Sequence, residues 1–294
     1  VLAARLVALR AAPRAGPYTG PVLLSGRATG VFFHEVMGHR VEGHRQKSDS
    51  EGKTFLEYVG RPVLPRWVDV VDDPTQERFG DVDLNGYYVW DDQGVAAEPA
   101  VLVDDGVFRG FLMGRSPLSV APTSNGHGRR SPGHEATARM GNTLVRVTGG
   151  LDDTKLAAAL RKEAAAQGLE YAYRVEEIDG GFTMTGRVVP NAFNVRASVT
   201  WRVYVDGRPD ELVRGIDLVG TPLAAFQGII AAGDRYEVFN GTCGAESGWV
   251  PVSAVAPPML FRRLEMQLKE KGSDRPPLLA PPLPAGSASL GVTR

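Results

Sequence analysis

Residues 31–44 constrain the fold and the chemistry of this chain more than any other stretch. They include three of the five histidines, two glutamates and an apolar flank of Val31, Phe32, Phe33, Val36, Met37 and Val41. Such a flank is typical of a helix that packs against a core. Packing alone does not explain so many ligand-type side chains on a buried element, so the stretch predicts a helix that carries a functional site.

The spacing of the first two histidines argues against a regular helix at this site. In the zinc-peptidase helix, two histidines four residues apart share one face, and the glutamate beside the first is a general base. His34 and His39 are five residues apart, which separates them by about 140° around a helix. A one-residue π-bulge would bring them into phase, and Gly38 would relax the backbone there. We therefore predict a distorted helix with a two-histidine metal half-site, and the alternative is a pair of ordinary, partly buried histidines.

Composition restricts the class of protein. The chain has 294 residues, of which 43% are hydrophobic, enough for one large core or two modest ones. Its 33 basic residues nearly balance 34 acidic ones, so we expect no nucleic-acid and no membrane partner. No apolar run approaches the roughly 20 residues of a spanning helix. The single cysteine fits a reducing compartment, so we expect a cytoplasmic protein, and the start at Val1 is typical of a fragment or a trimmed chain.

The hydrophobic periodicity predicts an α+β fold, with a mainly antiparallel β-sheet domain on which the metal-binding helix packs. We assign this domain to residues 1–268 and expect a Pro-rich, disordered tail at 269–294. One ordinary helix is expected at 151–168, and a second, buried helix at 222–232. The predicted strands and hairpins are 22–24, 67–71, 86–90, 101–112, 171–178, 182–189 and 198–216.

Two further stretches hold candidate functional residues. The loop at 122–130 is rich in glycine and ends in two arginines, so it is either a solvated surface loop or a clamp for a carboxylate or a peptide carbonyl. Cys243 lies between glycines that would expose its sulfur. With two histidines it would leave a fourth position for water, the layout of a catalytic zinc site. A lone cysteine is also often a small buried hydrophobe.

The motifs together resemble one family. His34, Glu35 and His39 with the following Val41-Glu42-Gly43 resemble the HExxxH signature of the TldD/PmbA metallopeptidases, once described as modulators of DNA gyrase. The threonine-glycine-arginine-arginine loop of that family is similar to Pro122-Thr123 followed by Gly126, Gly128, Arg129 and Arg130. Its C-terminal cysteine motif is similar to Gly241-Thr242-Cys243-Gly244 with Gly248 and Val250-Pro251-Val252. The three motifs stand in family order.

The resemblance implies a zinc-dependent peptidase with one ion per chain. His34, His39 and Cys243 would bind the metal, and Glu35 would activate the water as general base. Glu42 would orient a ligand histidine through its other ring nitrogen, or would be a solvated helix-end carboxylate. The residues expected to contact substrate are Thr123, Gly128, Arg129, Arg130 and Gly244.

The family also implies a substrate and a partner. We expect hydrolysis of small or unfolded peptides, in a homodimer or in a heterodimer with a related subunit. Two alternatives are a peptide-binding subunit without activity and a thiol hydrolase with Cys243 as nucleophile. The chain departs from the family pattern in its short N-terminal region, in His44 where an acidic residue is usual, and in the residues that follow Gly244.

Overall fold

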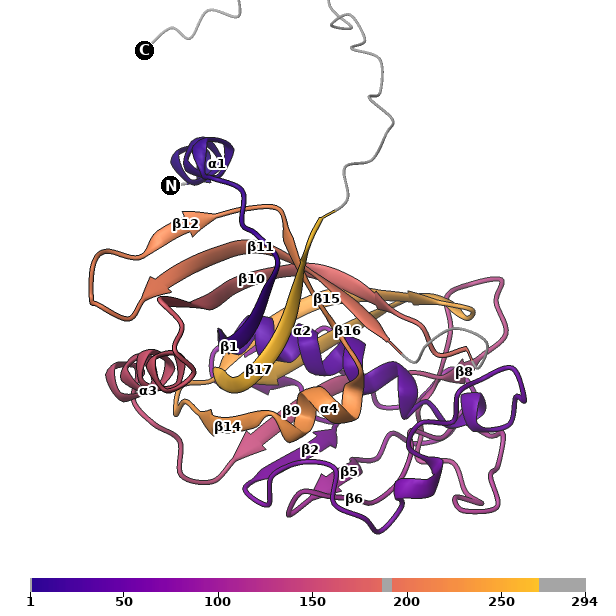
Figure 1. Cartoon of the computed structure of the whole chain (residues 1–294). Helices are drawn as coiled ribbons and strands as arrows, with labels where there is room; N and C mark the ends of the chain where they lie inside the picture. Colours follow the sequence, from indigo (N-terminus) through magenta and orange to yellow (C-terminus); the bar gives the residue numbers. More distant parts are fainter. Residues whose placement is uncertain (1, 187–191, 270–294) are drawn as a thin grey trace, which may run out of the picture.

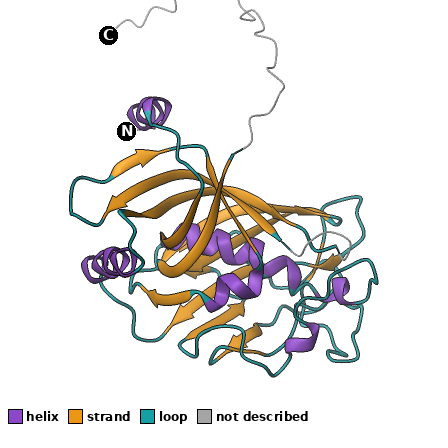
Figure 2. Ribbon diagram, viewed as in Figure 1, coloured by secondary structure: helices purple, strands orange, loops and turns teal. Residues whose placement is uncertain are grey.

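The computed structural model describes residues 2–186 and 192–269 and is built mainly from strands (Figures 1 and 2). In Figure 1 one group of strands lies above helix α2 (Gly26–Val36) and another lies below it. The predicted α+β class is confirmed. The tail predicted for 269–294 lies, apart from Lys269, outside the described residues, so the domain boundary at 268 stays a prediction.

The first of the two large sheets has seven strands. Its strands are β1 (Tyr18–Leu24), β10 (Tyr171–Thr183), β11 (Phe193–Tyr204), β12 (Glu211–Val213), β13 (Ile216–Gly220), β14 (Ile229–Ala232) and β17 (Met259–Leu268). Their order is β1-β10-β11-β13-β17-β14, with β12 on β11. Because β17 also pairs with β1, five of these strands form a closed ring of ladders. The β1–β10 pairing is parallel and the others are antiparallel.

The six-stranded sheet has the order β15-β16-β9-β2-β5-β6. Its strands are β2 (Val68–Asp72), β5 (Ala100–Asp104), β6 (Val107–Phe108), β9 (Asn142–Val147), β15 (Glu237–Ala245) and β16 (Gly248–Ala256). Only β9 and β16 pair in parallel within this sheet. Two short ribbons accompany it: β3 (Arg78–Phe79) with β4 (Val82–Asp83), and β7 (Gly128–Arg129) with β8 (Thr137–Ala138).

The structure contains further helical segments besides α2. They are α1 (Leu2–Ala11), α3 (Asp153–Ala166), α4 (Pro222–Gln227) and the 3₁₀ turns η1 (Gly38–Arg40), η2 (Gly43–Gln46) and η3 (Leu56–Tyr58). The helix predicted at 151–168 is α3, and Asp152 caps it by accepting a 2.9 Å hydrogen bond from the Lys155 amide. Gly168 follows its end with a φ of +69°, the left-handed conformation that glycine adopts at no steric cost.

Helix α2 begins at a side-chain cap and is buried against both sheets. The Ser25 hydroxyl accepts from the Ala28 amide at 3.1 Å and donates to the Glu176 carbonyl of β10 at 2.7 Å. This contact ties the first turn to the seven-stranded sheet. On the opposite side, Gly30 packs against β16, where an added Cβ would lie 3.0 Å from the Ala254 Cβ. The helix therefore has a fixed start and a fixed distance to each sheet.

Several predicted elements differ from the structure. Residues 86–90 form turns and a single bridge from Trp90 to Ala96 instead of a strand. The predicted buried helix at 222–232 was wrong beyond Gln227, because Ile229–Ala232 pairs with β17 as β14. Its apolar composition suits a buried strand as well as a helix. The hairpin at 101–112 is confirmed, with positive φ at Asp105 and Gly106. The part of 182–189 beyond residue 186 lies outside the described residues.

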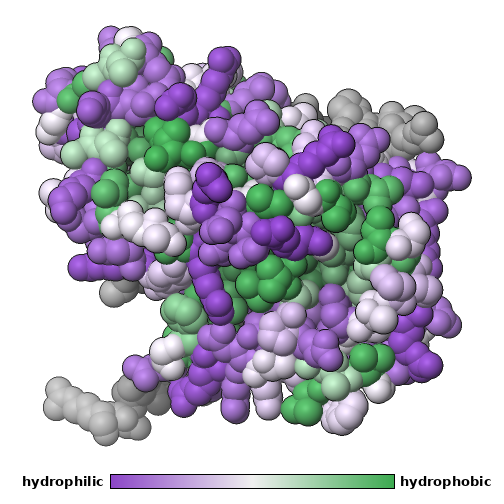
Figure 3. All heavy atoms as spheres, turned by 90° about the horizontal axis from the view of Figure 1, so that it is seen from below, coloured by the Kyte–Doolittle hydropathy of each residue, from purple (hydrophilic) through white to green (hydrophobic). Residues whose placement is uncertain are grey.

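The surface seen from below carries separate patches of hydrophobic side chains between hydrophilic ones (Figure 3). No helix in the described part of the chain is long and apolar enough to span a membrane.

Substitution of Phe32 tests the role of α2 as the centre of the core. Phe32 is fully buried, and its ring lies 5.2 Å from that of Phe261 and 5.4 Å from that of Phe193. We expect Phe32→Ala to lower the free energy of unfolding by about 3–5 kcal/mol in urea titrations. Phe182→Ala, at a phenylalanine that is 52% exposed, should change it by less than about 0.5 kcal/mol. Equal effects of the two variants would contradict this assignment.

Candidate metal centre

The two histidines of the HExxxH motif lie on different kinds of helix. His34 is in the last turn of α2, which ends at Val36, and His39 is in the 3₁₀ turn η1. The predicted π-bulge in a continuous helix was therefore wrong. The two histidines instead belong to separate helical segments, so the separation of about 140° expected on one regular helix does not apply to them. Their ring centroids are 5.2 Å apart, with the planes at 82°.

Two neighbouring residues stabilise the junction between α2 and η1. The Arg40 Nη1 donates to the Glu35 and Val36 carbonyls at 3.3 and 3.1 Å, so it satisfies acceptors that the end of α2 leaves unpaired. Gly38 packs against Met140, and a Cβ on Gly38 would lie 1.9 Å from the Met140 Sδ. Position 38 therefore requires glycine because Met140 packs so closely against it. A positive φ is not the reason, since Gly38 is not among the described glycines with positive φ.

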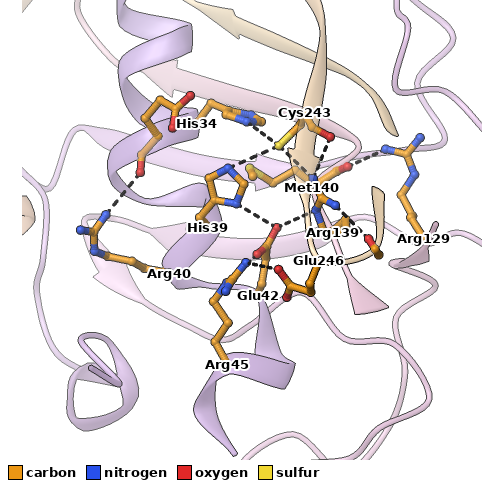
Figure 4. A network of polar contacts seen from close by, with 12 residues as sticks. His34, His39, Arg40, Glu42, Arg45, Arg129, Arg139, Met140, Cys243 and Glu246 are labelled. Atoms are coloured by element: carbon orange, nitrogen blue, oxygen red, sulfur yellow. Dashed lines mark hydrogen bonds and ion pairs between the residues drawn. The ribbon is translucent and has the colours of Figure 1, made fainter. Parts of the chain in front are cut away.

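Cys243 arrives from the six-stranded sheet. It lies on β15 opposite Val250 of β16, and its sulfur is 3.1 Å from the His34 Nε2 and 3.3 Å from the His39 Nε2. The hairpin β15–β16 thus delivers a thiol to two imidazoles that are more than 200 positions earlier in the chain. The three candidate ligand atoms lie within 4.8 Å of one another (Figure 4).

The donor set fits a zinc ion. Tetrahedral zinc with Zn–S of about 2.3 Å and Zn–N of about 2.0 Å places nitrogen and sulfur ligands roughly 3.5 Å apart. The two observed N···S distances, 3.1 and 3.3 Å, differ little from this value. Two imidazoles and one thiolate also leave a fourth position for water or substrate. The sulfur is buried, with Cys243 only 5% exposed, so the expectation that its glycines expose it was wrong.

A buried ionic network surrounds the ligands. The Glu42 carboxylate is 3.3 Å from the His39 Nδ1, 3.2 Å from the Arg139 Nε and 2.8 Å from the Arg45 Nε. The Arg139 Nη2 donates to the carbonyl and the sulfur of Cys243 at 2.9 and 3.0 Å. Glu42 and Arg139 are both fully buried. Glu42 therefore does not lie at a solvated helix end, and its contact to His39 is the kind that orients a ligand imidazole.

The protein charges alone favour the ligand form of the sulfur. Burial raises the pKa of the Cys243 thiol, but His34 and His39 outweigh it and lower the pKa to about 4. Burial lowers the pKa of His39, whereas Glu42 and Cys243 raise it to about 10. Burial likewise opposes ionisation of Glu42, yet His39, Arg45 and Arg139 lower the pKa of its carboxyl to about 2. At neutral pH a thiolate and a carboxylate thus stand beside a protonated His39, which would release its proton on binding a metal.

The network reaches the surface through a second carboxylate. The Arg45 Nη2 is 2.9 Å from the Glu246 Oε2, and the other Glu246 oxygen contacts the His44 Nε2. His44 is therefore a partner of Glu246 rather than a member of the candidate ligand group. Since Glu246 is on the turn of the β15–β16 hairpin, these contacts join the cysteine side of the site to the histidine side.

A cavity of about 410 Å³ opens over this cluster. Its wall includes the three candidate ligands, Glu35 and Gly244, so the structure brings the predicted general base and one predicted substrate residue to the same space. Glu35 is 8% exposed, and a Cβ on Gly181 of β10 would lie 3.3 Å from its Cγ. Strand β10 therefore forms the wall of the cavity next to Glu35.

The other predicted substrate residues do not line this cavity. Arg129 is buried, and its Nη1 donates to the Met140 and Pro251 carbonyls at 2.6 and 2.7 Å. Figure 4 shows it on the far side of Cys243 from the two histidines. Arg130 points to the His134 carbonyl at 3.1 Å. These contacts make both arginines supports of the local backbone. The remaining two positions, Thr123 and Gly128, are respectively exposed on a loop and buried in β7.

Sequence reasoning missed Arg139 and Arg40. Arg139 stands between Ala138 and Met140, and a charged residue in alternation with apolar ones usually indicates the solvent face of a strand. Here it points inward because Glu42 and Cys243 meet it there. Glu42 and Cys243 are far from Arg139 in the sequence, so the residues around Arg139 do not predict that it is buried against them.

The fold and the site define a candidate metal centre with two histidines, one cysteine and a carboxylate beside them. The family described as PmbA/TldA metallopeptidase C-terminal domain matches residues 17–268. The chain therefore belongs to the TldD/PmbA family, as the motifs predicted.

Similar proteins agree with this membership. A metalloprotease of Archaeoglobus fulgidus is 30% identical over 250 residues, 82% of this chain and 51% of that protein. A metalloprotease of Methanothermobacter thermautotrophicus is 29% identical over 80% of this chain and 47% of its own length. A zinc metalloprotease TldD homolog of Saccharolobus solfataricus is 23% identical over 86% of this chain and 52% of its own length. The chain thus spans about half the length of the curated relatives it matches.

The fold also has a solved counterpart. The crystal structure of TldE from Thermococcus kodakarensis aligns with a TM-score of 0.64 at 15% identity, over 90% of this chain and 53% of that one. At this identity the likeness concerns the fold.

Loss of the Glu42 charge tests its role beside His39. We expect Glu42→Gln to weaken Zn²⁺ binding about 10- to 100-fold, because the imidazole loses its anionic partner. Competition with a chromophoric chelator measures the affinity, and circular dichroism checks the fold. Glu57→Gln, at an exposed glutamate on η3, is the matched control and should bind zinc like the parent. An unchanged affinity in Glu42→Gln would remove Glu42 from the site.

Proposed function

We propose that this chain forms the catalytic part of a zinc-dependent peptidase that hydrolyses peptide bonds in small or unfolded peptides. One observation carries the proposal: two imidazoles from α2 and η1 and the sulfur of Cys243 from β15 converge on one point at the wall of a cavity. Family membership and the names of the relatives support the reaction class.

The residues present would divide the chemistry among them. His34, His39 and Cys243 would hold one zinc ion, which would lower the pKa of a bound water towards ~7 and polarise the peptide carbonyl. Glu35 lies on the same cavity wall, and it would take a proton from the attacking water. It would then pass that proton to the leaving amine. Glu42 holds the His39 ring through Nδ1, so the Nε2 faces the cluster.

The shape of the cavity suits an extended chain. Strand β10 forms one wall and the β15–β16 hairpin forms the other, with Phe182 and Trp249 exposed on the two sides. Aromatic side chains on both walls would bind apolar parts of a peptide while the backbone passes Glu35. We also propose that the chain acts as a pair, either with a second copy or with a related subunit. The likeness to a protein named TldE supports this part of the proposal. The lone, unpaired cysteine fits the expected cytoplasmic location.

The role of Glu35 is tested by an isosteric change. Glu35→Gln should lower kcat for peptide hydrolysis by about 10²- to 10⁴-fold, because the amide does not accept the proton. The variant should keep its zinc content and its thermal unfolding profile. Glu135→Gln, at an exposed glutamate, is the control and should retain full activity. Intact hydrolysis by a folded, zinc-loaded Glu35→Gln sample would refute the role.

Removal of the metal separates the zinc peptidase from both alternatives. A strong chelator should abolish hydrolysis, and added Zn²⁺ should restore it, because the zinc activates the water. A thiol hydrolase would keep its activity in the chelator and lose it on alkylation of Cys243. A peptide-binding subunit without activity would contain no stoichiometric zinc in elemental analysis and would hydrolyse nothing under either condition.

A further inference from the structure

A β-bulge turns an arginine into the wall of the cavity. The ladder between β10 and β11 shifts register where residues 178–181 face residues 195–197. Ile178 pairs with Ala197 and Gly181 with Val195. As a result, Asp179 and Gly180 of β10 both lie opposite the single residue Arg196 of β11. Bulges of this kind bend a strand and redirect side chains, and they occur often beside active sites.

The glycines of the bulge bring Arg196 and Glu35 to neighbouring parts of one wall. A Cβ on Gly180 would lie 3.9 Å from the Arg196 Nη2, and a Cβ on Gly181 would lie 3.3 Å from the Glu35 Cγ. Gly180 has a φ of +121°, which side-chain-bearing residues rarely adopt. Arg196 and Glu35 both line the cavity of about 410 Å³. The guanidinium of Arg196 and the side chain of Glu35, the predicted general base, therefore lie next to consecutive glycines of β10.

Arg196 differs from the other arginine of the cavity in having no protein partner there. Arg45 is bound by Glu42 and Glu246 at 2.8 and 2.9 Å. Arg196 is exposed, and among residues 2–186 and 192–269 it forms neither a hydrogen bond nor an ion pair. Its cross-strand neighbour is Asp217. Burial raises the pKa of Asp217 while the charges of Lys269 and Arg196 oppose this rise, and no hydrogen bond or ion pair joins Asp217 to Arg196. The donors of Arg196 thus remain available to a ligand.

Resting on the peptidase function proposed above, we propose that Arg196 binds a carboxylate of the peptide substrate. The planar guanidinium donates two parallel hydrogen bonds to a carboxylate, a geometry that a lysine ammonium does not offer. Asp179 lines the same wall, so the local field is mixed and the arginine fork has to supply the recognition. The carboxylate belongs either to the free C-terminus of the peptide or to an aspartate or glutamate side chain within it.

Calorimetric titration of three peptides tests the proposal without relying on hydrolysis. The protein is the 294-residue chain with Glu35→Gln as the common background, so that the peptides stay intact. The probes are acetyl-Ala-Ala-Ala with a free C-terminus, the same peptide as its C-terminal amide, and acetyl-Ala-Glu-Ala amide. We expect at least one carboxylate peptide to bind about tenfold or more tightly than the neutral amide. The stronger of the two identifies the source of the carboxylate.

Variants then assign the preference to Arg196. Arg196→Gln should remove the preference for the carboxylate and leave binding of the neutral amide unchanged, whereas Arg196→Lys should restore only part of it. Arg235→Gln removes an exposed arginine that pairs with Asp153 outside the cavity, and it should preserve the preference in full. Circular dichroism and thermal unfolding show whether each variant is folded.

The possible failures are distinguishable. Equal binding of the three peptides to the parent overturns the role of Arg196 even if Arg196→Gln does not fold, and it leaves the peptidase proposal intact. A carboxylate preference that persists in folded Arg196→Gln also overturns it. Absence of hydrolysis by the zinc-loaded chain that retains Glu35, together with a carboxylate preference in the Glu35→Gln background, would contradict the proposed function but support the binding role of Arg196.

Discussion

The guanidinium of Arg139 links the two halves of the candidate metal centre. It is fully buried and contacts Glu42 on the side that follows α2, and Cys243, Ser247 and Gly248 on the β15–β16 hairpin. A buried charge is tolerated only when it is paired with an opposite charge, and removing one partner of such a pair typically costs about 3–5 kcal/mol. The positions of the histidines and the cysteine thus depend on a charge that is itself no candidate ligand.

Ionic contacts join the two layers of the fold that supply the candidate ligands. Helix α2 is tied to the seven-stranded sheet through Ser25, while Cys243 belongs to the six-stranded sheet. Without cross-links, small shifts between the layers would separate sulfur and imidazoles. The Arg139–Glu42 pair and the Arg45–Glu246 pair each connect one layer to the other. The ionic contacts therefore preorganise the donor atoms, and a metal ion would meet a cluster that is already assembled.

The sequence allowed prediction of those features that depend on local chemistry or on a motif. The Asp105–Gly106 hairpin and the helix near Asp152 follow from turn and cap residues, and both are present. The His34, His39 and Cys243 grouping followed from the motifs, and the structure brings these residues together. The end of the predicted helix at 222–232 could not be foreseen, since pairing with β17 decides between helix and strand for an apolar run.

The predicted arginine clamp illustrates the same limit at the site. Arg129 and Arg130 were placed at the substrate because a basic, glycine-rich loop suggests an exposed anion grip. In the structure neither lines the cavity over the metal cluster, and the Nη1 of each donates to backbone carbonyls: Arg129 to Met140 and Pro251, and Arg130 to His134.

Arg196, by contrast, lies in a strand with no motif around it. Its access to the cavity comes from a register shift that no single segment encodes, because a bulge is a property of two paired strands. An arginine is available to a ligand when its hydrogen-bond donors have no partner in the folded protein. Which donors lack a partner is decided only when the strands have paired, so the sequence of one strand does not reveal it.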